Sequence, residues 1–77
     1  MRNEVIQLFA EEVGCSPSQV QPDNTLEEDL GLDAIKLAAL QLSIESEIGK
    51  DIDDYQWLEC RTIQDIITLA GSQLATH

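Results

Sequence analysis

The sequence predicts an all-α fold, a small four-helix bundle with three main helices, one short helix before the last and a long first loop. Three observations predict it. Apolar residues recur at helical spacing in three segments. No segment shows the alternation typical of a strand. The 77 residues, 43% of them hydrophobic, suffice for one small core, so residues 1–77 are expected to form a single domain.

The first helix is expected over residues 2–13. Its apolar positions fall at helical spacing, and Glu11 and Glu12 lie on the other side. The apolar positions are Val5, Ile6, Phe9 and Val13. Gly14 follows as a fitting end.

A long connection follows, rich in Pro, Ser, Asn and Asp, and a loop this long in a small domain is usually functional. Ser16 before Pro17 predicts a short helical turn. Thr25 and Glu28 have the spacing of a capping box. Spaced apolar residues are expected to pin the loop to the core, namely Val20, Leu26, Leu30 and Leu32.

The second helix is expected to start after Asp33, its cap, and to run to about Ile48 before Gly49. It carries two apolar stripes, and a helix in a small bundle buries one stripe well. The stripe expected inside comprises Leu37, Leu40, Ile44 and Ile48. The other, expected to stay partly exposed as an interface unless both pack inside, comprises Ile35, Ala38, Ala39 and Leu42.

The closely spaced Asp51, Asp53 and Asp54 do not form a calcium loop, because the sixth loop position lacks glycine and the twelfth is Thr62. Asp54 is instead expected to cap a short helix over residues 55–59. Thr62 and Asp65 again have capping-box spacing and open a last helix to about residue 74. Its inward residues are expected to be Ile63, Ile66, Ile67, Ala70 and Leu74.

The formal charge of −11 makes nucleic acid and anionic membranes poor partners. It favours a basic patch on another protein as a partner, unless the charge serves solubility alone. No secretory signal follows Met1 and no run could span a bilayer, so a soluble cytoplasmic protein is expected. Cys15 and Cys60 are then expected as reduced thiols, although a disulfide stays open. Neither has metal-ligand spacing, and no metal site is predicted.

An enzyme is not expected. The single histidine, His77, is the last residue, where chain ends fray. No nucleophile elbow, phosphate-binding loop or zinc spacing occurs. The carboxylates are scattered over expected surface faces, which leaves no catalytic residue to name.

Four stretches together resemble the acyl carrier protein family of phosphopantetheine-binding carrier domains. They are "EEVGCSPSQVQPDNTLEEDLGLD", the junction Asp33–Ala34, "IESEIGKDIDD" and "RTIQDIITLA". The resemblance implies a carrier that holds an acyl or aminoacyl group as a thioester on a 4′-phosphopantetheine arm and presents it to partner enzymes. In that family the loop ends in Asp-Ser, and the serine is esterified by the arm. A helix N-terminus suits the phosphodiester, because its N–H groups and dipole favour an anion.

The matching position here is Ala34, which has no oxygen to esterify, so the chain as written is held in the unmodified form. Ser43 and Ser46 lie too far inside the helix to replace it. Two explanations remain: a carrier changed from serine to alanine, or a natural armless adaptor that binds a synthase through its second helix. The intact surroundings, with Asp33 before the position and Ile35 after it, favour the first.

The resemblance also implies partners: a phosphopantetheinyl transferase, a loading enzyme, and synthase or tailoring enzymes, met by a monomer. "DAIK" is closer to the "DSIK" of peptidyl and some polyketide carriers than to fatty-acid carriers, and indicates secondary-metabolite biosynthesis. Docking is expected at Ile35, Lys36, Ala39 and Leu42, with Glu45 and Glu47 at the rim. A cavity for a short acyl chain is expected to be lined by Leu40, Ile44 and Ile63.

Overall fold

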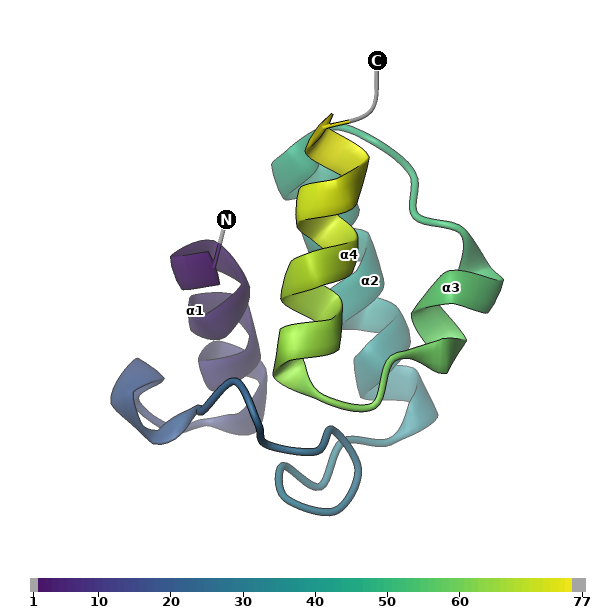
Figure 1. Cartoon of the computed structure of the whole chain (residues 1–77). Helices are drawn as coiled ribbons and strands as arrows, with labels where there is room; N and C mark the ends of the chain where they lie inside the picture. The colour runs from purple at the N-terminus through teal and green to yellow at the C-terminus, as the bar shows by residue number, and fades with distance from the viewer. Residues whose placement is uncertain (1, 76–77) are drawn as a thin grey trace.

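Four α-helices make up the fold of the computed structural model, which describes residues 2–75 (Figure 1). They are α1 (Arg2–Val13), α2 (Ala34–Ile48), α3 (Asp54–Glu59) and α4 (Ile63–Ala75), with a short 3₁₀ helix, η1 (Pro17–Gln19), between the first two. This confirms the predicted all-α bundle with three main helices and one short one. The prediction about His77 concerns a residue outside the described range.

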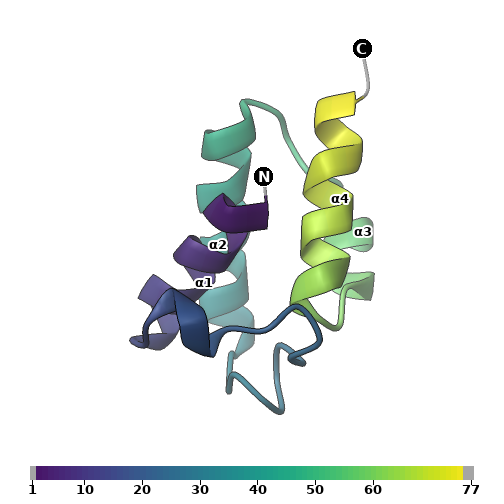
Figure 2. The same ribbon diagram turned by 60° about the vertical axis from the view of Figure 1, so that its left-hand side comes forward.

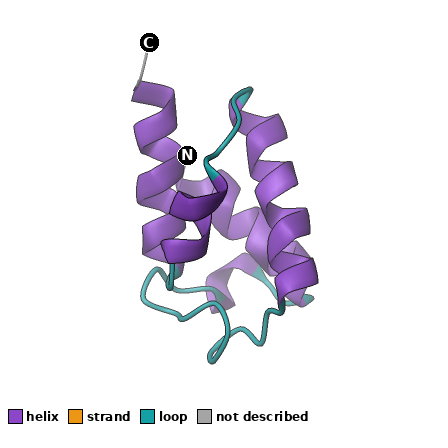
Figure 3. Ribbon diagram, turned by 90° about the vertical axis from the view of Figure 1, so that its right-hand side faces the viewer, coloured by secondary structure: helices purple, strands orange, loops and turns teal. Residues whose placement is uncertain are grey.

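The three long helices pack on one another, and α3 stands on the side of α4 away from α1 (Figure 2). The loop between η1 and α2 crosses the end of the bundle at which α2 and α4 begin (Figure 3). This end therefore brings together the start of α2, the long loop and the turn between α3 and α4.

The core is mainly aliphatic and includes two aromatic rings, those of Phe9 and Trp57. Phe9, Ile44 and Ile63 are fully buried at its centre, and Trp57 closes the side next to α3. The inner stripe of α2 is confirmed, since Leu40, Ile44 and Ile48 are buried and Leu37 is partly buried against the core. On α4 the residues expected inside are buried or partly buried except Leu74, which is 43% exposed because the helix extends there past most of its neighbours.

The helix ends follow local chemistry. Gly14 and Gly49 adopt positive φ angles of 86° and 71° after α1 and α2, a conformation that glycine takes without strain. At the start of α4, Thr62 N–H donates to Asp65 Oδ2 and Asp65 N–H donates to Thr62 Oγ1, both at 3.2 Å. The capping box predicted there is confirmed.

Two local predictions were wrong by one residue. Asp53, not Asp54, caps α3, because its Oδ1 accepts hydrogen bonds from the N–H groups of Tyr55 and Gln56. Thr25 pairs reciprocally with Asp29 instead of Glu28, at 2.8 and 3.0 Å. That segment is a series of turns, so the spacing of an α-helical capping box does not apply to it.

Buried apolar side chains and backbone hydrogen bonds hold the long loop against the rest of the protein. Val20, Leu26 and Leu32 are buried, as expected for apolar anchors, and Leu30 is partly buried. Backbone hydrogen bonds join Leu26 N to Arg61 O at 2.9 Å and other loop residues to the start of α4. No helix within residues 2–75 combines the length and apolarity needed to cross a membrane.

Candidate functional site

The start of α2 is the junction that the sequence singles out. Asp33 has an extended backbone and caps the helix, with its Oδ1 accepting a hydrogen bond from Lys36 N–H at 2.9 Å. Ala34 is the first helical residue and is exposed. The position therefore combines solvent access with a helix N-terminus, where backbone N–H groups and the dipole favour an anionic group. The alanine methyl itself has no atom that could bind one.

The loop before this junction is held in a fixed path. Gly31 takes a φ of 67°, which turns the chain between the partly buried Leu30 and the buried Leu32, and Leu32 N–H donates to Leu26 O at 3.0 Å. Thr25 also pairs as an isolated antiparallel bridge with Thr62 at the start of α4. The exposed carboxylates of Glu27 and Glu28 consequently stand beside the junction on an ordered loop.

A cavity of about 710 Å³ opens next to Ala34, between α2 and α3. Such a volume falls within the roughly 300–1,000 Å³ of small-molecule clefts. One wall is formed by Leu37, Ala38 and Gln41 of α2, the opposite wall by Trp57 and Leu58 of α3. The long loop and the turn at Cys60 and Arg61 close one end.

This location corrects the lining expected from the sequence. Leu40, Ile44 and Ile63 are 3%, 0% and 0% exposed and belong to the packed core, not to the cavity. The helical spacing correctly places them on the inner face. The cavity lies on the neighbouring face, which points toward α3, because α3 stands off from α2 instead of packing directly on it.

Gln41 connects the two walls. Its Nε2 donates hydrogen bonds to Ile52 O at 3.2 Å and to Asp54 Oδ1 at 2.8 Å, across the cavity from its own helix. This residue and Trp57 were not identified from the sequence. A polar residue between the two apolar stripes of α2, and the sole tryptophan on the short helix, were the signals available.

The second apolar stripe of α2 is exposed. Ile35 is 81% and Leu42 68% exposed, and Ala38 and Ala39 are also open to solvent. Lys36 and Glu47 flank them on the surface. Glu45 is partly buried, and its Oε2 accepts a hydrogen bond of 2.7 Å from Ile52 N–H, so this carboxylate fixes the chain after α2.

The two cysteines are the remaining reactive groups among residues 2–75. Cys15 and Cys60 are both free thiols. Burial, with help from the charges of Asp65 and Glu59, raises the pKa of Cys60 to about 11, which keeps this thiol protonated. Among the residues that the structure describes, no group of three His, Cys, Asp or Glu side chains could hold a metal ion.

Comparison with known proteins supports the resemblance. Residues 3–70 match the family model described as a phosphopantetheine attachment site. The chain is 32% identical to an acyl carrier protein of Thermotoga maritima over 94% of its own length and 89% of the relative's. It is 30% identical to one from Nitratidesulfovibrio vulgaris strain DP4 over 95% and 96%, and 29% identical to the acyl carrier protein MbtL of Mycolicibacterium paratuberculosis over 82% and 71%.

Proposed function

The chain belongs to the phosphopantetheine-binding carrier family, whose members are carriers and not enzymes, and from this premise we propose that residue 34 is its attachment position, disabled by alanine. In its serine form the protein would hold an acyl or aminoacyl thioester on a 4′-phosphopantetheine arm. The observation that carries the proposal is the exposed first residue of α2, capped by Asp33 and opening onto the cavity.

The residues present fit the arm. Its phosphate would lie at the N-terminus of α2, where the N–H groups of the first turn point. The arm would supply the thiol, and the cavity beside Ala34 would receive the group carried on it. The protein's own part is to fix the anchor point, which the ordered loop and the Asp33 cap do.

The surroundings support a serine-to-alanine variant over a natural armless adaptor. An adaptor has no need of an exposed helix start that opens onto a cavity, yet both features are intact here. Alanine is the best helix former and leaves the fold undisturbed.

Loading tests the proposal directly. The Ala34→Ser variant, incubated with coenzyme A and a phosphopantetheinyl transferase, should gain the mass of one phosphopantetheine group. Ala38→Ser is the matched control, because it places a hydroxyl in the same cavity one helical turn further on and should gain nothing. A folded Ala34→Ser protein that gains no mass would instead support the adaptor.

We further propose that partner enzymes, in a dedicated cytoplasmic biosynthetic pathway of the polyketide or peptide type, dock on α2. Ile35, Ala39 and Leu42 would form an apolar centre, and Lys36 and Glu47, with a minor share from Glu45, the polar rim. The charge of −11 favours basic partner surfaces.

The kcat/KM of a phosphopantetheinyl transferase acting on the Ala34→Ser protein measures how well this enzyme docks on α2. Adding Leu42→Ala should lower kcat/KM about tenfold, which corresponds to about 1.4 kcal/mol of lost contact. Leu74→Ala removes an exposed leucine from α4 and should leave the rate unchanged. Equal rates for both variants would remove α2 from the docking surface.

A further inference from the structure

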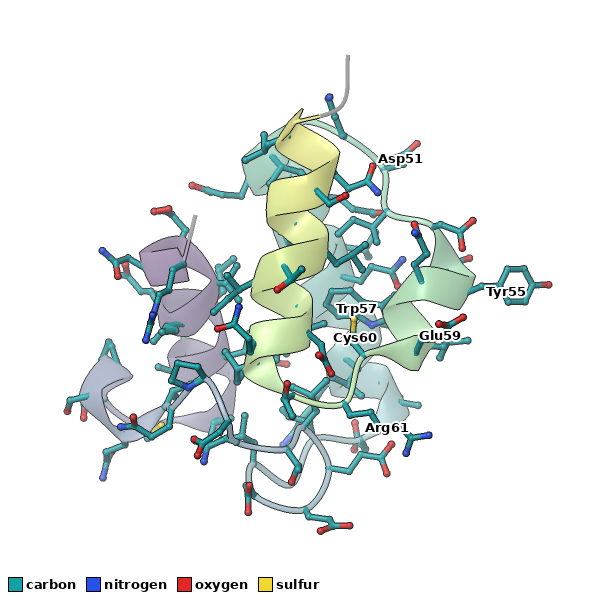
Figure 4. All side chains as sticks on the ribbon, viewed as in Figure 1. Asp51, Tyr55, Trp57, Glu59, Cys60 and Arg61 are labelled. Carbon is teal, nitrogen blue, oxygen red and sulfur yellow. The ribbon has the colours of Figure 1, made fainter. Side chains whose placement is uncertain are left out.

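The lining of the cavity beside Ala34 includes a hydrogen-bond donor that has no partner among the described residues. Trp57 is only 5% exposed and points from α3 toward α2 and α4, while Tyr55 points away (Figure 4). Its indole Nε1 donates to none of the described residues, and yet no enclosed side-chain nitrogen or oxygen of residues 2–75 lacks a partner. Nε1 therefore keeps some contact with solvent, and Trp57 is one of the residues that line the cavity.

An acceptor lies on the opposite wall. The amide of Gln41 is held in one orientation, because its Nε2 donates to both Ile52 O and Asp54 Oδ1. Its Oε1 accepts no hydrogen bond from the described residues. Trp57 and Gln41 thus give the cavity lining one donor and one acceptor that no described residue uses, alongside the apolar side chains of Leu37 and Leu58.

The charges at the rim of the cavity exclude acyl groups that carry a negative charge. Glu27, Glu28 and Asp54 bring three carboxylates to the cavity, against the single cation of Arg61. A carboxylate on the occupant would be repelled there. A plain alkyl chain would remove water from the indole N–H and the amide oxygen without replacing the hydrogen bonds, which is unfavourable.

We propose that the cavity selects acyl groups with a neutral hydrogen-bonding substituent, such as a hydroxyl, which accepts from Trp57 Nε1 and donates to Gln41 Oε1. The inference rests on the proposed function, because it is the arm from residue 34 that would deliver the acyl group. Trp57 and Gln41 then determine specificity for the cargo.

The test uses the chain as it is, labelled with ¹⁵N, and free pantetheine thioesters. Trp57 is the only tryptophan, so a single indole cross-peak reports on the site. S-(3-hydroxyhexanoyl)pantetheine should shift this peak and bind at least about threefold more tightly than S-hexanoyl-pantetheine, and S-succinyl-pantetheine should be the weakest. Absence of an indole shift with the hydroxylated compound, or equal binding of the alkyl compound, would overturn the proposal.

Two variants locate the selectivity. Trp57→Phe keeps an aromatic ring and removes the donor, so the preference for the hydroxylated compound, followed by the backbone peaks of Leu37 and Ala38, should fall to about one. Tyr55 is 78% exposed and lies outside the cavity, so Tyr55→Phe, which removes its hydroxyl, should change nothing. If Trp57→Phe does not fold, the titration of the unaltered chain decides alone. Failure of the Ala34→Ser protein to accept a phosphopantetheine group would refute the proposed function. It would not change the result of this titration.

Discussion

Replacing Asp65 with alanine should destabilise the protein by about 1.5 kcal/mol. The carboxylate accepts hydrogen bonds from Arg61 N–H at 2.9 Å and Thr62 N–H at 3.2 Å, and alanine leaves both donors without it. Two such bonds contribute about 2 kcal/mol. The better helix propensity of alanine returns about 0.5 kcal/mol. For a domain of this size the loss should lower Tm by about 6–12 °C.

Circular dichroism during heating and urea unfolding followed by Trp57 fluorescence measure this loss. Asp51→Ala is the matched control, since it removes an exposed carboxylate from a loop and should change stability by less than about 0.5 kcal/mol. It also corrects for the relief of self-repulsion in a chain with a charge of −11. Equal unfolding midpoints for the two variants at neutral pH would refute the capping role.

The pH dependence gives the same reasoning a second check. The hydrogen bond from the Arg61 backbone, with those from Thr62, holds the pKa of Asp65 below its ordinary value of 3.8. A group with a lowered folded-state pKa stabilises the fold fully above its unfolded pKa, and this contribution is lost as the pH falls through the folded-state pKa. The difference in the free energy of unfolding between Asp65→Ala and Asp51→Ala should therefore have its full size at pH 7 and should disappear at pH values below 3.8. A difference that persists unchanged in acid would contradict the assignment.

Other substitutions and one labelling reaction test the core, the helix ends and the partly buried thiol of Cys60. Ile44→Ala, at a fully buried position, should cost about 2–5 kcal/mol in urea unfolding; a smaller loss would mean that the core collapses around the gap. Gly49→Ala should destabilise by about 1 kcal/mol because φ is 71°, whereas Gly71→Ala, in a helix with open space, should stabilise by about 0.5–1 kcal/mol. Effects of the same sign would contradict this reading of the two backbones. Cys60, with its pKa raised from 9.0 to about 11, should react with iodoacetamide at pH 8 about a hundredfold more slowly in the folded protein than in urea, by mass spectrometry of its peptide. Equal rates would show that the thiol is not shielded.

Local features of the fold could be predicted from the sequence, because each depends on residues within one or two turns. The bounds of α1 and α2 and the Thr62–Asp65 capping box are of this kind. The cap of α3 was misplaced because Asp53 and Asp54 are adjacent and chemically equivalent, and only the backbone path distinguishes them. The exposed stripe of α2 followed from its excess of apolar surface.

The cavity could not be predicted in the same way. Its walls come from α2 and α3, whose separation depends on how Trp57 packs and how Gln41 reaches Asp54, 13 positions along the chain. Helical periodicity places Leu40 and Ile44 on the inner face of α2. It does not predict where the packed core ends and the cavity begins. The junction at Ala34 was found because its signal lies in consecutive residues.

The two sides of the cavity differ in how firmly they are built. α2 has 15 residues and a buried stripe along its length, whereas α3 has six residues and buries only Trp57. A helix this short has no stability of its own in water. Any enlargement of the cavity for a bulkier acyl group would therefore come from displacement of α3. This displacement would break the Gln41–Asp54 hydrogen bond, while Ala34 at the start of α2 stays in place.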